Sequence, residues 1–223
     1  MKTNAICAIA TAKGSSALGV IRISGENLNS LLSHLFTKKL SDRRAILTDI
    51  KFQNVVLDNC IVILYCAPKS YTGEDLVEIS CHGSTFIQES IIQLLFKFNC
   101  RLAKPGEFTM RSFLNGKMDL SQAESVADLI SSNSEASHKL AINQMRGGFK
   151  NDINDLRSEL VNFASLIGLE LDFSQEDLEF ANMNEFIALL DRISFSLKTL
   201  IDSFKTGNVI KNGIPIVIAG EPN

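Results

Sequence analysis

The first hundred residues alternate short apolar runs with segments of helical periodicity. Runs rich in β-branched residues predict strands over residues 5–10 and 18–24, and further strands over 45–52, 59–66 and 76–81. Two amphipathic helices separate some of these runs. One is predicted by the leucine spacing of residues 28–35, and the other over residues 84–98, where a Gly83-Ser84 pair supplies a start signal. This mixed order predicts an α+β domain rather than a regular βαβ wind.

After Pro105-Gly106 the strand-like runs vanish, and each apolar repeat has a helical period. The segment from Ser121 to Glu124 has the form of a capping box, which predicts that a helix starts there and runs to about residue 130. A second helix is expected over 134–145, and two long amphipathic helices over 149–171 and 186–204. Together these helices predict an all-α bundle. The acidic segment 170–179 between the long helices fits a solvated helix end and loop.

The last residues pose a physical problem. A turn is expected at 211–213, followed by a strand-like apolar run over 214–219 and the sequence Gly220-Glu-Pro-Asn223. A buried strand needs neighbours on both sides, and nothing follows this one in the sequence. A strand that ends in glycine is also how a phosphate-binding P-loop begins. The competing interpretation is a C-terminal strand with a polar tail.

Composition narrows the class of protein. The 223 residues are 45% hydrophobic and 21% charged, which excludes disorder along the whole chain. The longest apolar stretch, residues 61–67, is far shorter than the ~20 residues that a membrane-spanning helix needs. The first residues do not resemble a signal peptide. We therefore expect a soluble, cytoplasmic protein with no membrane partner.

The formal net charge of −3 conceals a split between the two halves. Residues 1–118 hold 14 basic and 9 acidic side chains, a net charge of +5, whereas residues 119–223 hold 8 and 16, a net charge of −8. The basic half is therefore the better candidate for an anionic ligand or RNA. All five cysteines lie in the first hundred residues without metal-ligand spacing, which favours free buried thiols over a metal or redox site.

Five sequence blocks resemble the bacterial and organellar tRNA modification GTPase family, also called the MnmE/TrmE family. They occur in the family's order and spacing, and the last two are long and specific. The blocks are LGVIRISG (18–25), SYTGEDLVE (70–78), CHG (81–83), PGEFT (105–109) and RSFLNGKMDLSQAE (111–124). The final VIAGEPN (217–223) is similar to the lead into the family's GTP-binding domain.

The resemblance implies three parts: an α+β tetrahydrofolate-binding and dimerisation domain over 1–117, an incomplete helical domain over 118–211, and the truncated start of an α/β P-loop GTPase domain over 212–223. Family members act with a flavin- and NADH-dependent partner. They build a carboxymethylaminomethyl-type group on carbon 5 of the wobble uridine of certain tRNAs, with a one-carbon tetrahydrofolate as the donor. The chain is then expected to form a homodimer through its N-terminal domain.

The resemblance carries three folate contacts over to Arg22, Glu78 and Lys117. A carboxylate such as Glu78 suits the amidine-like donor edge of a pterin ring, and Arg22 or Lys117 suits the carboxylates of the folate's glutamate tail. From the residues alone, Arg22 also fits an edge-strand charge, Glu78 a solvent-facing strand residue and Lys117 a helix-end cation. His82, beside Gly83, either positions a ligand or caps the following helix.

The resemblance also matches Asn223 to a P-loop residue that helps to coordinate potassium beside GTP. The lysine that reaches the phosphates and the serine that holds magnesium are not in the sequence, so this chain by itself is expected not to hydrolyse GTP. Two stretches depart from the family pattern, at residues 12–17 and 172–177, and neither touches the three folate positions. Two alternatives remain open: a stand-alone folate-binding or one-carbon transfer module, and a dimerisation scaffold without a ligand.

Overall fold

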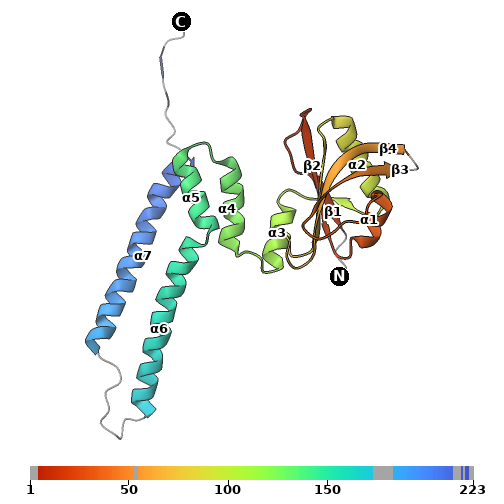
Figure 1. Cartoon of the computed structure of the whole chain (residues 1–223). Coiled ribbons are helices and arrows are strands. Elements are labelled where there is room, and N and C mark those ends of the chain that lie inside the picture. Colours follow the sequence, from red (N-terminus) through yellow and green to blue (C-terminus); the bar gives the residue numbers. More distant parts are fainter. Residues whose placement is uncertain (1–4, 53–54, 173–182, 213–216, 218, 221–223) are drawn as a thin grey trace. The chain divides into compact units, whose positions relative to one another are not determined.

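The computed structural model describes residues 5–52, 55–172, 183–212, 217 and 219–220. The chain divides into two compact units, Met1–Ala123 and Glu124–Asn223, each of which is described by itself. The first unit is a mixed sheet with helices, and the second is helical (Figure 1). The predicted fold class, an α+β domain followed by an all-α domain, is confirmed for the described residues.

Six strands form the sheet in the order β3-β4-β5-β2-β1-β6. All neighbouring strands run antiparallel except β1 and β6. The six strands are β1 (Ile6–Ile9), β2 (Leu18–Gly25), β3 (Ala45–Phe52), β4 (Val55–Tyr65), β5 (Asp75–His82) and β6 (Arg101–Leu102). The five predicted strands are all present, although β4 begins four residues earlier than expected. The two-residue strand β6 was not predicted, because so short a segment has no apolar period.

Helices α1 (Asn29–Leu35) and α2 (Thr85–Lys97) cover one face of the sheet (Figure 1). Their leucines and isoleucines pack against sheet residues that are fully buried, among them Ile21, Ile23 and Ile79. Because strand side chains alternate between faces, the residues between these positions point to the opposite face. Arg22 and Glu78 therefore lie on the sheet face that α1 and α2 do not cover.

Helix α3 (Glu107–Leu114) follows the Pro105-Gly106 turn, and was not predicted as a separate helix. Helix α4 (Leu120–Ser131) corrects the predicted capping box at Ser121. Asp119 and Gln122 exchange the reciprocal bonds instead: the Gln122 backbone N–H donates to Asp119 Oδ1 (2.9 Å), and the Asp119 N–H to Gln122 Oε1 (3.0 Å). An aspartate and a glutamine three residues apart make the same kind of cap two residues earlier in the chain.

The remaining helices are α5 (Glu135–Met145), α6 (Gly148–Asp172) and α7 (Met183–Asn212), as the apolar spacing predicts. The rings of Phe163 and Phe186 stack between α6 and α7 at 4.3 Å. Helix α7 continues through Gly207 to Asn212, so the turn predicted to begin at residue 211 is wrong for residues 211 and 212. Among the described residues, no helix is both long and apolar enough to cross a membrane.

Two predictions fall mainly outside the described residues. The acidic segment beyond Asp172 lies outside them, as does most of the terminal strand over 214–219. The described residues Val217, Ala219 and Gly220 are not in a strand. Asn223 also lies outside the described residues.

Candidate functional site

The first feature of the site is an ion pair between Arg22 of β2 and Glu78 of β5. The two residues are direct partners in the antiparallel register. Arg22 donates to Glu78 Oε1 twice, from Nε (3.0 Å) and from Nη2 (2.6 Å). Both side chains are about a quarter exposed, 29% and 25%. Glu78 Oε2 accepts no hydrogen bond from the described residues, so one carboxylate oxygen remains available to a ligand.

Two aromatic rings lie against the same arginine. The Arg22 guanidinium carbon lies 5.4 Å from the ring centre of Tyr71 and 5.8 Å from that of Phe108, both within cation–π range. Tyr71 comes from the loop before β5 and Phe108 from the first turn of α3. The Tyr71 hydroxyl is 2.9 Å from Thr109 Oγ1, which holds the loop and α3 together. A partly exposed charge pair beside two half-buried aromatic rings suits a flat heteroaromatic ligand with polar edges.

A buried ionic network anchors α3 to this loop. Arg111 Nη1 donates to both carboxylate oxygens of Glu74, at 3.0 and 2.8 Å, and Arg111 Nη2 reaches Glu107 Oε1 at 3.4 Å. Glu107 also pairs with Arg101, through two hydrogen bonds. These bonds from Arg101, assisted by the Lys104 backbone N–H and the charge of Arg111, lower the pKa of Glu107 to about 2 although burial opposes them. The network fixes the elements that carry Tyr71 and Phe108.

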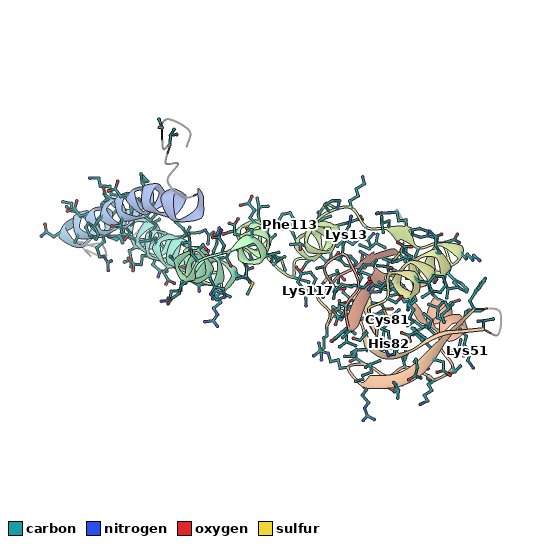
Figure 2. The ribbon with its side chains drawn as sticks, turned by 90° about the horizontal axis from the view of Figure 1, so that it is seen from above. Lys13, Lys51, Cys81, His82, Phe113 and Lys117 are labelled. Carbon is teal, nitrogen blue, oxygen red and sulfur yellow. The ribbon has the colours of Figure 1, made fainter. Side chains whose placement is uncertain are left out.

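Lys117 reaches the same loop from the segment after α3 (Figure 2). Its Nζ donates to the carbonyl oxygen of Pro68 (3.0 Å), and its side chain is exposed. Gly73, at φ +80°, allows the close approach, because a Cβ there would lie 3.0 Å from Asn115 Cβ and 3.2 Å from Lys117 Cγ. The Asn115 amide also donates to the Thr72 carbonyl (2.7 Å).

His82 ends β5 and pairs with Asp58 of β4 (Figure 2). Its Nδ1 lies 2.7 Å from Asp58 Oδ1, and its backbone N–H donates to Asp58 Oδ2 (2.8 Å). The imidazole is 67% exposed, whereas the carboxylate is 6% exposed. Ser84 is the N-cap residue of α2, but its side chain makes no capping hydrogen bond. The contacts of His82 are therefore with β4, and both interpretations of this residue stay open.

A hollow of about 490 Å³ adjoins the loop, and neither Arg22 nor Glu78 lines it. Its walls come from the residues after β2, the loop before β5 and α3, and include Glu26, Asn27, Gly73, Glu74, Arg111 and Asn115. Glu74 and Arg111 in this wall are already paired with each other. The hollow is therefore adjacent to the candidate site, and the loop that carries Gly73 contributes to both.

The cysteines are free thiols, as predicted. Burial raises the pKa of Cys7 and of Cys60 to about 12, and that of Cys100 to about 11. Cys66 is half-buried, and its pKa is also raised, by partial burial and by the charges of Asp42 and Asp75. The described residues hold no group of three or more histidine, cysteine or acidic side chains placed to bind a metal ion.

The structure thus brings Arg22 and Glu78 into direct contact, and joins Lys117 to them through the loop over residues 68–74. Sequence reasoning missed two members of the site, Tyr71 and Phe108. Both belong to sequence blocks already singled out. The available signal was an aromatic residue close to a turn: Tyr71 precedes Gly73, and Phe108 follows Pro105-Gly106. Nothing tests the predicted role of Asn223.

Two family models match the chain. The model described as the GTP-binding protein TrmE N-terminus matches residues 5–117, and the model of the MnmE helical domain matches residues 120–215. The first range contains every member of the candidate site. The boundary between the matches lies close to the division of the chain into two compact units.

Curated proteins named tRNA modification GTPase MnmE are similar along the chain. The protein from Flavobacterium psychrophilum is 57% identical over 98% of this chain and 49% of its own length. The protein from Flavobacterium johnsoniae is 57% identical over 99% of this chain and 49% of its own length. The protein from Bacteroides thetaiotaomicron is 52% identical over 100% of this chain and 50% of its own length. The chain spans about half the length of these relatives.

Proposed function

Because the chain belongs to the MnmE/TrmE family of tRNA modification GTPases, we propose that its N-terminal unit binds a one-carbon tetrahydrofolate derivative through Arg22, Glu78 and Lys117. The observation that carries this proposal is the Arg22–Glu78 pair. The guanidinium uses one oxygen of the carboxylate and leaves the other accessible. The donor edge of a pterin ring would bind to that accessible carboxylate.

The surroundings of the pair support this proposal. Tyr71 and Phe108 offer aromatic surface of the kind on which a pterin ring stacks, and both rings lie within 6 Å of the Arg22 guanidinium carbon. Arg22 has no second carboxylate partner among the described residues, so its two donors orient Glu78. Lys117, exposed beside Pro68, then becomes the cation for the carboxylate end of the folate.

In the whole protein, we propose that the folate supplies the one-carbon unit for a carboxymethylaminomethyl-type modification at carbon 5 of the wobble uridine of tRNA. We propose this role from family membership. On the same ground we propose a homodimer, a flavin- and NADH-dependent partner and a cytoplasmic location. The proposed parts are 1–117, 118–211 and 212–223. We propose Asn223 as a potassium ligand beside GTP, whereas the P-loop lysine and the serine that would hold magnesium are not in this sequence.

The sequence holds no complete G-x-x-x-x-G-K-[ST] segment. We therefore propose that this chain by itself does not hydrolyse GTP. The lysine and the magnesium ligand of a P-loop supply most of the charge that stabilises the transferred phosphoryl group. A nucleotide turnover assay with the purified chain tests this point, and measurable release of phosphate from GTP would refute it.

Calorimetric titration with 5-formyl-tetrahydrofolate tests the folate proposal. Glu78→Gln keeps the size of the side chain and removes its charge, so we expect binding to weaken by ~1.5–3 kcal/mol, the range for a charge-assisted hydrogen bond. The matched control is Glu89→Gln, which removes an exposed carboxylate from α2 on the other face of the sheet. Equal affinities for the wild type and Glu78→Gln would remove Glu78 from the site.

A further inference from the structure

Two cationic side chains bind the backbone carbonyls of Pro68 and Lys69. Lys117 Nζ donates to the Pro68 carbonyl (3.0 Å), and Arg43 Nη2 donates to the Lys69 carbonyl (2.5 Å). The two carbonyls belong to consecutive residues, so both cations are bound to the same short stretch of backbone. Lys69 itself adds the third charge. We call Arg43, Lys69 and Lys117 the cationic rim.

The fold assembles the rim from three distant parts of the sequence. The Arg43 backbone N–H donates to the Leu64 carbonyl (2.7 Å), which ties the segment before β3 to the end of β4. Gly73 leaves room for Lys117 beside the same loop, because a Cβ there would lie 3.2 Å from Lys117 Cγ. Arg43 and Lys117 are far apart in the sequence, so their common contact with the Pro68–Lys69 backbone cannot be predicted from the sequence alone.

The positive charge of the rim is not neutralised by ion pairs. None of its three side chains forms a salt bridge with a described residue, and all three are exposed. Two acidic side chains are close to the rim in the chain, Asp42 beside Arg43 and Asp75 at the start of β5, and their charges offset two of the three positive charges. Asp42 Oδ1 accepts from Cys66 (2.8 Å), and Asp75 Oδ1 accepts from Ala67 (3.0 Å). The rim therefore keeps a positive surplus that favours an anion.

We propose that the cationic rim binds the γ-linked glutamate chain of a polyglutamylated folate. This inference rests on the proposed function, which places the carboxylate end of the folate at Lys117. Each additional γ-linked glutamate carries one more carboxylate in an extended, flexible chain. Lys69 and Arg43 add two exposed cations beside the stretch of backbone that Lys117 contacts, so additional carboxylates have cationic partners there. The preferred ligand is then a reduced folate with several glutamates rather than one with a single glutamate.

The expected gain in affinity is moderate, because each pair is exposed to solvent. A surface ion pair strengthens binding by up to about fivefold, so two such pairs predict about tenfold tighter binding of a longer chain. The gain should fall as salt rises from low ionic strength to 0.5 M, because exposed charges are screened. A hydrophobic contribution would not fall in this way.

The test compares mono- and tetraglutamyl 5-formyl-tetrahydrofolate by calorimetry on the purified chain. We expect the tetraglutamyl form to bind about tenfold tighter to the wild type, and the ratio to approach one in an Arg43→Gln, Lys69→Gln double variant. The matched control, Lys51→Gln with Lys97→Gln, removes the same charge from β3 and α2 and should keep the wild-type ratio. Far-ultraviolet circular dichroism of each variant establishes that it is folded.

The outcomes separate this inference from the proposed function. Equal affinities for the two ligands, with binding still sensitive to Glu78→Gln, would overturn the tail site and leave the folate site standing. An undiminished ratio in the Arg43, Lys69 variant would also overturn it. Binding of neither folate would overturn both.

Discussion

Arg22 and Glu78, 56 positions apart in the sequence, face each other across β2 and β5 with 2.6 Å between Nη2 and Oε1. The flanking residues on both strands point into the core, where Ile21, Ile23 and Val77 are fully buried. This burial fixes the register, because a slip by one residue would turn the charges inward. The hydrophobic core therefore determines the geometry of a polar site on the opposite face.

Arg22→Lys tests whether the two-donor geometry matters. Lysine keeps the charge but has neither the planar fork nor the same contact with Tyr71 and Phe108. We expect folate affinity to fall roughly tenfold, as for the loss of one charge-assisted hydrogen bond, whereas the free energy of unfolding changes by less than about 1 kcal/mol because the pair is partly exposed. Calorimetry and urea denaturation measure the two effects. A large loss of stability with unchanged affinity would make Arg22 a structural residue only.

Because the pKa of Glu107 is lowered to about 2 in the folded chain, the free energy of unfolding of the N-terminal unit depends on pH in the acid range. The contribution is complete above the ordinary pKa of 4.5 and is lost as pH falls from there towards 2. Glu107→Gln leaves Arg101 and Arg111 short of a carboxylate, so we expect a loss of roughly 3 kcal/mol at pH 7 and a weaker dependence on pH below 4.5.

Tyrosine fluorescence follows this unfolding selectively, because the sequence has no tryptophan and its two tyrosines, Tyr65 and Tyr71, both lie in the N-terminal unit. Glu89→Gln is the control, since an exposed carboxylate on α2 should change stability by at most about 0.5 kcal/mol. If Glu107→Gln matched Glu89→Gln in both stability and acid response, the buried network would not stabilise the unit.

The elements of the fold could largely be predicted from apolar spacing, because strands and amphipathic helices leave local periods of two and about 3.6 residues. The site could be predicted only in part. Resemblance marked Arg22 and Glu78, but their pairing depends on strand register, which local sequence does not encode. Tyr71 and Phe108 join them through loop and helix packing. The cap of α4 was misplaced because Asp119 and Ser121 both satisfy the same short pattern.

Gly73→Ala tests the close approach between the loop and Lys117. Alanine at φ +80° is strained, and its Cβ would also press on Asn115 and Lys117. We expect a loss of about 2–3 kcal/mol in the free energy of unfolding, followed by tyrosine fluorescence. Gly106→Ala is the matched control, because its φ of +73° carries similar strain but no atom lies within 4 Å of the new Cβ. A larger loss for Gly106→Ala would contradict the packing argument.

Cys66 is predicted to be the most reactive thiol of the folded chain. The other four cysteines are buried, and burial raises the pKa of each. Titration with a disulfide reagent should show one accessible thiol in the native chain and five in denaturant. Because the pKa of Cys66 is also raised, its rate should keep increasing with pH beyond the range of an ordinary thiol. Loss of the fast phase in Cys66→Ser identifies the residue, and its persistence would refute the assignment.

The most direct test of the folate site is a crystal structure of the chain with 5-formyl-tetrahydrofolate. The account predicts density for the pterin ring beside Tyr71, with its donor edge within hydrogen-bond distance of Glu78 and its carboxylate end towards Lys117. Density in the neighbouring hollow lined by Arg111 and Asn115, with none at the Arg22–Glu78 pair, would contradict it.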